Sequence, residues 1–265
     1  VCPFVPVRDI TMEECAELAR RLGARVGEEL GIPVYLYEDA ASRPERRNLA
    51  TVRSGQYEGL AAKLANPDWA PDFGPAEYND KVIAAGATAI GARPFLIAFN
   101  VNLNTKSTRK AMKIAATIRE MGMYCKDEKG RFIVNEKGEK YREPGMFKCV
   151  KAIGWYIEEY GCCQVSINFT DYRVSSVHDV VDATRRVADR EGVIVTGCEL
   201  VGLIPLDAML QAGWHYLRRQ EVNPGVPEKE VVEVAIRSLG LRDLGPFDAN
   251  EAIIEHRIDS DGPLV

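Results

Sequence analysis

The stretch RPFLIAFNVNL, residues 93–103, is the strongest indicator of the fold, and QVSINF, residues 164–169, repeats its pattern. In both stretches apolar side chains alternate with others, and alternate residues of a strand point to opposite faces of a sheet. One face of each predicted strand is apolar and can pack on helices. The other face carries amides and a hydroxyl without charge: Asn100 and Asn102 on the first strand, Gln164, Ser166 and Asn168 on the second. Such a face suits a bound group that is polar and uncharged.

Composition and charge place the chain among ordinary globular proteins. Its 265 residues are 46% hydrophobic and 28% charged, with a net charge of -5, and they can bury a full core. The negative charge, without a dense basic patch, argues against a nucleic-acid partner. No apolar run reaches membrane-spanning length and no signal peptide is recognisable, so we expect no membrane partner. The chain opens inside a strand pattern, VCPFVPV at residues 1–7, which predicts a fragment of a longer protein.

The cysteines give no sign of a disulfide framework or a zinc site. There are seven, an odd number, and no Cys-x-x-Cys pair occurs. Zinc sites and disulfide scaffolds need paired cysteines at characteristic spacings. We therefore expect reduced thiols in a cytoplasmic protein that holds no metal.

The first part of the chain predicts helices around a short strand. Thr11 and Glu14 fit a capping box, so a helix is expected from there to about Leu30, where Gly31 ends it. Loops longer than about a dozen residues often carry function. The segments expected after this helix are a strand at 34–37, broken helical pieces over 42–66 and a long loop over 67–86.

From residue 95 onward the order of elements is that of a ferredoxin-like fold. The expected elements are a strand at 95–103, a helix at 107–121, strands near 148–157 and 163–169, a helix near 176–191 and a closing strand near 193–196 or 199–204. This β-α-β-β-α-β order predicts helices on one face of the sheet. It also makes the first and third strands central neighbours.

Two further segments accompany this unit. The charged segment 124–144, with Gly130 and Gly138 at its turns, is expected to form a surface hairpin. Residues 205–265 predict helices packed around the edge of the fold. Pro205 is expected at the first helical position of one of these helices, and Asp248 as the N-cap of another.

The predicted topology brings the five polar side chains of the two strands together in the middle of the helix-free face. The alternative is a solvated face, which is common in antiparallel sheets. Solvated faces usually carry Lys, Glu and Thr rather than a nearly uncharged set of amides. We therefore favour a covered surface that faces a ligand.

Other patterns of catalytic chemistry are missing from the sequence. His178, His215 and His256 lie far apart along the chain without the spacing of metal ligands, so we expect structural or surface roles for them. The nucleophile-elbow, Walker and dinucleotide-binding motifs do not occur. Asp72 and Glu77 in the predicted loop could accept hydrogen bonds from a heterocycle or simply face solvent.

Seven motifs resemble, in order, those of the glutamate formimidoyltransferases, the formiminotransferase domain of the formimidoyltransferase-cyclodeaminase family. They are VCPFVPVR at 1–8, PVYLY at 33–37, PDFGP at 71–75, GARPFLIAFN at 91–100, GWY at 154–156, QVSIN at 164–168 and LVGLIPL at 200–206. The resemblance implies transfer of the formimidoyl group from N-formimidoyl-L-glutamate to tetrahydrofolate. The products would be 5-formimidoyltetrahydrofolate and L-glutamate, a step of histidine degradation and one-carbon metabolism.

The resemblance also implies an α/β fold of two ferredoxin-like subdomains whose sheets face each other across a tunnel. Residues 1–86 would be the remainder of the N-terminal subdomain, 87–204 the C-terminal subdomain and 205–265 a helical extension packed on it. The five polar residues of the two central strands would line the tunnel. The family's folate-contacting loop matches this chain at Gly74, Pro75, Ala76, Glu77, Tyr78 and Gly86.

Partners and location follow from the same resemblance. It implies tetrahydrofolate, or its polyglutamylated form, as a co-substrate, together with N-formimidoyl-L-glutamate and without a metal. It also implies a homodimer, which we expect in the cytoplasm; charge and hydropathy predict no nucleic-acid or membrane partner.

The sequence departs from the family at its start. The family's catalytic histidine lies in a His-Pro-Arg-Met-Gly-Ala-Leu-Asp stretch directly before the motif that begins here at Val1. We therefore expect a chain that lacks the catalytic histidine and has no useful activity alone. Two alternatives stay open: a glutamate formyltransferase of the same fold, or a non-catalytic module that binds folate or an amino acid.

Overall fold

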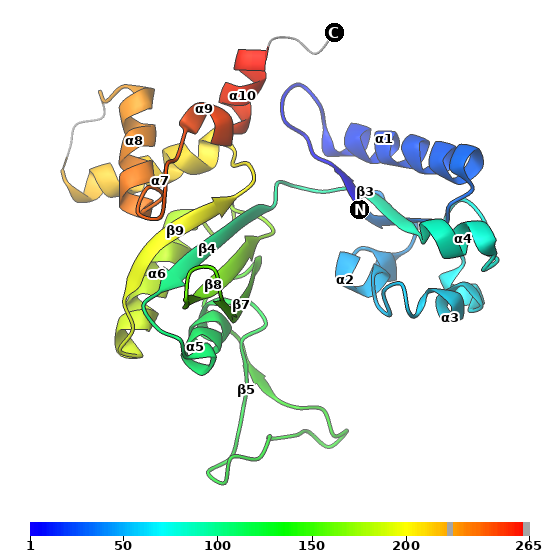
Figure 1. Ribbon diagram of the computed structural model, residues 1–265, viewed down its shortest axis with the longest axis horizontal. Helices are drawn as coiled ribbons and strands as arrows, with labels where there is room; N and C mark the ends of the chain where they lie inside the picture. The colour runs from blue at the N-terminus through cyan, green and yellow to red at the C-terminus, as the bar shows by residue number, and fades with distance from the viewer. Residues whose placement is uncertain (222–224, 262–265) are drawn as a thin grey trace. The chain divides into compact units, whose positions relative to one another are not determined.

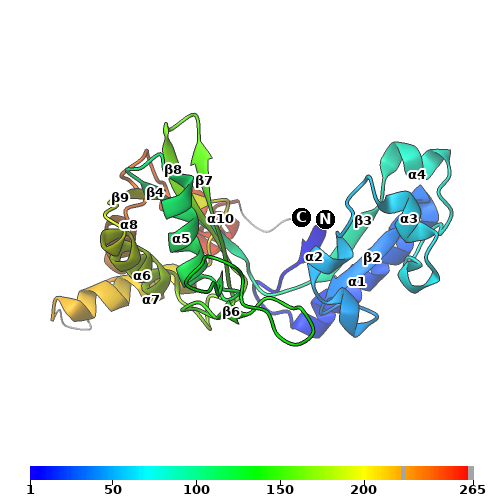
Figure 2. The same ribbon diagram turned by 90° about the horizontal axis from the view of Figure 1, so that it is seen from below.

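The computed structural model describes residues 1–221 and 225–261 and divides into two units, Val1–Phe95 and Leu96–Val265. Figures 1 and 2 show both units. Each combines helices with a sheet of its own. The α/β class predicted from the sequence is confirmed.

The first unit is built on a three-stranded sheet in the order β1-β3-β2. Its strands are β1 (Cys2–Phe4), β2 (Val34–Glu38) and β3 (Thr88–Ala92). All of them run parallel, so the antiparallel ferredoxin-like order expected from the resemblance does not describe these three strands. Parallel strands are usually buried on both faces, and β2 is buried at four of its five residues.

Helices cover both faces of this sheet. On one face α1 (Met12–Arg25) continues as a π-helical segment, Val26–Leu30, and packs with Leu36 and Ile90 in one core. The other face carries Tyr35 and Tyr37 in a second core. The short helices of that face are α2 (Leu49–Val52), α3 (Leu60–Leu64) and α4 (Asp80–Ala85).

The expected start and end of the first helix are confirmed. The Thr11 side chain accepts from the Glu14 backbone N–H, and the Glu14 side chain accepts from the Thr11 backbone N–H. These bonds satisfy N–H groups that a helix start leaves without partners. At the other end Gly31 has φ 60, a conformation that glycine adopts without steric cost.

The prediction of a continuous loop over 67–86 is wrong. Residues Pro67–Trp69 form a 3-10 turn and Asp80–Ala85 form α4. Asn79 caps α4 by accepting from the backbone N–H groups of Lys81 and Val82. Val82 is fully buried in the second core, and this tertiary contact is what stabilises so short a helix.

A buried ion pair anchors the rest of that segment to the sheet. Arg46 donates to the Asp72 carboxylate at 2.8 Å, and the two side chains are 1% and 8% exposed. Asp72 also accepts from the backbone N–H of Leu36 in β2. Arg46 donates in addition to the carbonyl of Ala70. The Asp72 carboxylate, for which a heterocyclic ligand or solvent was considered, is therefore held by structural contacts.

We expect Arg46→Ala to destabilise the first unit by about 3–5 kcal/mol, because it leaves the Asp72 carboxylate buried without its partner. Urea unfolding followed by circular dichroism measures this change. The matched control is Arg47→Ala: Arg47 pairs with Asp39 but is 62% exposed, so its loss should cost at most about 1 kcal/mol. Equal effects of the two substitutions would contradict the buried role of Arg46.

The domain boundary expected after residue 86 is wrong by nine residues. The division lies between Phe95 and Leu96 because β3 pairs with both β1 and β2 of the first unit. Strand β3 is thus the central strand of the first sheet.

The second unit has a four-stranded antiparallel sheet in the order β7-β8-β4-β9. Its strands are β4 (Ile97–Leu103), β7 (Val150–Ile157), β8 (Cys162–Phe169) and β9 (Val195–Val201). Figure 1 shows α5 (Thr108–Ile118) and α6 (Val177–Arg190) on one side of this sheet. The predicted β-α-β-β-α-β order, with the first and third strands at the centre, is confirmed.

Helix α5 lies very close to β7 at one glycine. A Cβ at Gly154 would come within 2.2 Å of the Ala111 carbonyl carbon, so only glycine fits between the helix and the strand. Gly154 belongs to the GWY motif that the sequence singled out. Close packing against α5 therefore explains why this motif has glycine at position 154.

The charged segment between α5 and β7 forms the expected hairpin. Its base is the pairing of β5 (Met123–Tyr124) with β6 (Arg142–Glu143). Gly130 and Gly138 have φ 78 and 79 and lie at its turns. Figure 1 shows this segment extending from the sheet as an arm.

Helices complete the second unit, as expected. They are α7 (Leu206–Arg219), α8 (Glu228–Leu239), α9 (Ala249–Ala252) and α10 (Ile254–Asp261). Pro205 precedes α7 as its N-cap rather than occupying the first helical position. Asp248 is the N-cap of α9, as expected, and accepts from the backbone N–H of Asn250. None of the helices in the part of the chain that the structure describes could cross a membrane.

All seven cysteines are free thiols, as predicted. Cys163 and Cys198 are buried in the second unit. Burial raises the pKa of Cys198 to about 12, so its thiol stays protonated and unreactive at neutral pH.

Candidate active site

The polar residues of β4 and β8 lie side by side on one face of the second sheet. The register pairs Asn100 with Ser166 and Asn102 with Gln164, and it places Asn168 opposite Ala98. Directly paired residues of antiparallel strands share a face. The opposite face of both strands is fully buried against the helices: Ile97, Phe99, Val101 and Leu103 in β4, and Val165, Ile167 and Phe169 in β8. The prediction that each strand has one apolar and one polar face is confirmed.

Three of the five polar residues are shielded from solvent. Asn100 is 8% exposed, Asn102 is 2% exposed and Gln164 is fully buried. Ser166 is half-buried, and Asn168 is exposed. The middle of this face is therefore covered within the structure, while its Asn168 end is open to solvent.

A carboxylate lies at the centre of this face, where only uncharged side chains were expected. Glu199 of β9 pairs with Asn100. Its Oε2 accepts from Asn100 Nδ2 at 3.0 Å and from Gln164 Nε2 at 3.4 Å. The expectation of a face without charge is thus wrong. The last strand was predicted at 193–196 or at 199–204; the first range leaves Glu199 out and the second only begins with it, whereas β9 spans Val195–Val201. The polar–apolar pair EL at 199–200 is the signal that could have placed Glu199 on this face.

Tyr160 reaches over the buried amides. It lies in the turn between β7 and β8, yet its hydroxyl donates to Glu199 Oε1 of β9 at 3.4 Å. Because β8 and β4 lie between β7 and β9 in the sheet, the Tyr160 side chain extends across the face that bears the amides. The Glu199 carboxylate raises the pKa of Tyr160. Tyr160 is itself 52% exposed, so it forms an outer layer over this part of the sheet.

Two amide oxygens under this layer have no hydrogen-bond partner. They are Asn102 Oδ1 and Gln164 Oε1, both buried, and they belong to directly paired residues. An unsatisfied buried polar group costs about 1–3 kcal/mol. Such groups are rare in folded proteins, and each calls for an explanation.

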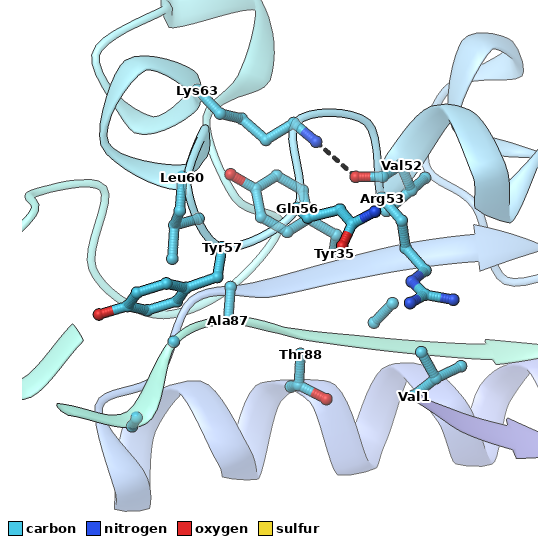
Figure 3. A pocket seen from close by; sticks show the side chains of 13 residues that line it. Val1, Tyr35, Val52, Arg53, Gln56, Tyr57, Leu60, Lys63, Ala87 and Thr88 are labelled. Carbon is cyan, nitrogen blue, oxygen red and sulfur yellow. Dashed lines mark hydrogen bonds between the residues drawn. The ribbon is translucent and has the colours of Figure 1, made fainter. Parts of the chain in front are cut away.

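The first unit holds a cavity of about 350 Å³ next to β2 and β3. Figure 3 shows Tyr57, Lys63 and Thr88 among the side chains around it. The Lys63 ammonium donates to the carbonyls of Val52 and Ser54, and burial lowers the pKa of Lys63. The lining residues are Val1, Tyr35, Val52, Arg53, Gln56, Tyr57, Leu60, Lys63, Ala85, Gly86, Ala87, Thr88 and Ala89.

The residues predicted to contact folate do not form one group around this cavity. Gly86 lines it. Tyr78 is hydrogen-bonded to the lining residue Tyr57, and this bond raises the pKa of Tyr78. Pro75 is half-buried, and Ala76 and Glu77 are exposed; none of the three is among its lining residues.

Gly74 has a structural role of its own. Its φ is 81, and a Cβ there would lie 2.3 Å from the carbonyl oxygen of Ile32. Both observations require glycine at this position. The match of Gly74 to the family's loop is therefore explained by backbone packing, without a ligand.

The packing of α6 against α7 brings two histidines together that lie far apart in the sequence. The rings of His178 and His215 are 4.3 Å apart between centroids. Both belong to helices rather than to the polar face of the sheet. His178 is 8% exposed, and burial lowers its pKa from the usual 6.5, against the opposing effect of Asp179. The structural role predicted for His178 agrees with this burial.

The lowered pKa of His178 predicts a loss of stability in acid. Below about pH 6.5 the unfolded chain protonates His178 while the folded chain keeps it neutral, so the free energy of unfolding falls as pH falls. The slope from this group is at most about 1.4 kcal/mol per pH unit. Thermal unfolding of His178→Asn between about pH 7.5 and 5.5 should show a shallower pH dependence than the wild type. An unchanged slope would show that His178 does not carry this effect.

Two models of known protein families match consecutive parts of this chain. A family model described as "Formiminotransferase domain" matches residues 98–259, and one described as "Formiminotransferase domain, N-terminal subdomain" matches residues 1–93. The chain belongs to the formiminotransferase domain family. The two matches adjoin where the structure divides the chain, between Phe95 and Leu96.

Relatives with curated names support this assignment. The chain is 41% identical over 263 residues to a formimidoyltransferase-cyclodeaminase of Mus musculus, covering 99% of this chain and 45% of that protein. A protein of the same name from Sus scrofa is 42% identical over 264 residues, with the same coverage. A glutamate formimidoyltransferase of Streptococcus pyogenes serotype M1 is 41% identical over 221 residues, or 83% of this chain and 66% of that protein. The chain spans about half the length of the formimidoyltransferase-cyclodeaminases that it matches.

Proposed function

We propose that the protein transfers the formimidoyl group of N-formimidoyl-L-glutamate to tetrahydrofolate and releases 5-formimidoyltetrahydrofolate and L-glutamate. The observation that carries this proposal is the covered set of amides on β4 and β8, held by Glu199, in a chain of the formiminotransferase family. Relatives named glutamate formimidoyltransferase support the reaction. The amide face supports a site for a small polar group.

The proposed reaction proceeds by addition and elimination. N5 of tetrahydrofolate attacks the formimidoyl carbon, and the electron pair of the C=N bond moves to nitrogen to give a tetrahedral intermediate. The intermediate then expels the α-amine of glutamate, and the proton lost from N5 passes to this leaving nitrogen. A group that carries this proton typically contributes about 10²–10⁴-fold to the rate. In the family that this chain resembles, a histidine is the candidate for that group; His178 and His215 of this chain lie on helices of the second unit.

The residues of this chain would orient the donor. The amides of Asn100, Asn102 and Gln164, with Ser166 and Asn168 beside them, offer fixed hydrogen-bonding groups on a rigid sheet. Placing two reactants in an attack geometry supplies a large part of an enzyme's rate. Tetrahydrofolate, or its polyglutamylated form, is proposed to contact the segment of Gly74, Pro75, Ala76, Glu77, Tyr78 and Gly86. Of these residues, Gly86 and Tyr78 adjoin the cavity of the first unit.

The remaining proposals follow the family. We propose a homodimer and a cytoplasmic location; the free thiols support the location because reducing compartments preserve them. The reaction as proposed uses tetrahydrofolate as a co-substrate and needs no metal.

The test is steady-state transfer by the full-length protein with N-formimidoyl-L-glutamate and tetrahydrofolate. We expect turnover by the wild type. Asn100→Ala and Asn168→Ala should each lower kcat/KM by about 10–10²-fold, because each removes a group that orients the donor. The control is Arg186→Ala on the exposed side of α6, which should leave the kinetics unchanged.

Two results would contradict the proposed function. Unchanged kinetics for both asparagine variants would remove the amide face from the site. Turnover with N-formyl-L-glutamate but not with the formimidoyl donor would instead show a formyltransferase of the same fold.

A further inference from the structure

The amides on the polar face have a fixed orientation. A carboxylate can only accept hydrogen bonds, so Asn100 and Gln164 must turn their NH2 groups toward Glu199, as the distances of 3.0 and 3.4 Å show. The assignment of amide O and N atoms is thereby set by chemistry. The carbonyl oxygen of Gln164 consequently points away from Glu199 and has no partner. Next to it, across the strands, lies the unpartnered oxygen of Asn102.

We propose that Glu199 makes this face an acceptor site that selects the positively charged amidine end of the donor over a neutral formyl group. The inference rests on the proposed function and identifies which form of the one-carbon group the site takes. It also assigns Glu199 as a specificity-determining residue and Tyr160 as the side chain that covers this face.

The chemistry of the two donors differs at the one-carbon group. The formimidoyl group is an amidine, a strong base that is protonated at neutral pH, so its terminal nitrogen carries only N–H donors and shares a positive charge. The oxygens of Asn102 and Gln164 offer the acceptors that these donors need, and the Glu199 carboxylate supplies the opposite charge. A formyl group ends in a carbonyl oxygen, which would face acceptors and leave them unsatisfied. Sites with buried polar groups discriminate strongly against ligands that leave those groups unpaired.

Tyr160 explains how the acceptors can be buried and still be used. Its hydroxyl donates to Glu199 across the sheet, and its side chain is 52% exposed. It can therefore leave the face by rotating toward solvent, without disturbing the core. The donor's N–H groups would then take the place of the Tyr160 hydroxyl near Glu199 and supply partners to Asn102 and Gln164.

The test is calorimetric binding of N-formimidoyl-L-glutamate and N-formyl-L-glutamate to the full-length protein. The wild type is expected to bind the formimidoyl compound about 10–10²-fold more tightly, as the loss of hydrogen bonds to a charged group predicts. Glu199→Gln keeps the size of the side chain and removes its charge, and it should abolish most of this difference. Glu158→Gln, in the exposed turn before Tyr160, is the matched control and should retain it.

A second variant tests the proposal even if the Glu199→Gln protein does not fold. Tyr160→Phe removes the hydroxyl that competes for Glu199, so it should bind the formimidoyl compound more tightly than the wild type by a few-fold. Equal affinities of the wild type for the two compounds, no binding of either, or a preference that survives Glu199→Gln would overturn the proposal.

This measurement separates the inference from the proposed function. A Glu199-dependent preference in binding without any transfer to tetrahydrofolate would refute the transferase and leave the acceptor site standing. Transfer to tetrahydrofolate without a Glu199-dependent preference would support the transferase and refute the acceptor site.

Discussion

The register between β4 and β8 is the constraint on which the second unit depends. It pairs Asn102 with Gln164 and Asn100 with Ser166 on one face, and Val101 with Val165 on the other. Because side chains alternate with a period of two, a slip by one residue would bury the amides in the core and expose the apolar set. The apolar face, fully buried against the helices, opposes such a slip. The same burial that stabilises the sheet thus fixes the positions of the polar residues.

The position of β9 then determines the chemistry of that face. Glu199 enters beside Asn100 and fixes the orientation of two amides through its carboxylate. The result is a face that contains two unpartnered acceptor oxygens, Asn102 Oδ1 and Gln164 Oε1. Unsatisfied groups oppose folding, and the proposed acceptor site would give these two oxygens partners in the bound state. Functional sites often contain local arrangements that lower the stability of the fold.

The sequence predicted the second unit well because its signal is local. The alternation in residues 93–103 and 164–169 determines which face each side chain joins, and the order of elements determines which strands are neighbours. The motifs that resemble the family gave its identity for the same reason, since they are read residue by residue. The capping box at Thr11 and the N-cap at Asp248 are also local, and both are confirmed.

The features that could not be predicted from the sequence depend on contacts between distant segments. Strand β3 joins the first unit through pairing with β1 and β2, and α4 is stabilised by the burial of Val82. The stacking of His178 on His215 and the pairing of Arg46 with Asp72 join helices or loops that no spacing rule relates. Glu199 was missed because a short apolar strand has uncertain bounds, and its partners lie 99 and 35 residues away.

A crystal structure of the full-length protein with N-formimidoyl-L-glutamate would show whether the donor binds the two amide oxygens. We expect the terminal nitrogen of the donor within hydrogen-bond distance of Gln164 Oε1 or Asn102 Oδ1, with the Tyr160 hydroxyl moved away from Glu199. A donor bound elsewhere, with Tyr160 still on Glu199 and both amide oxygens unpaired, would contradict this expectation.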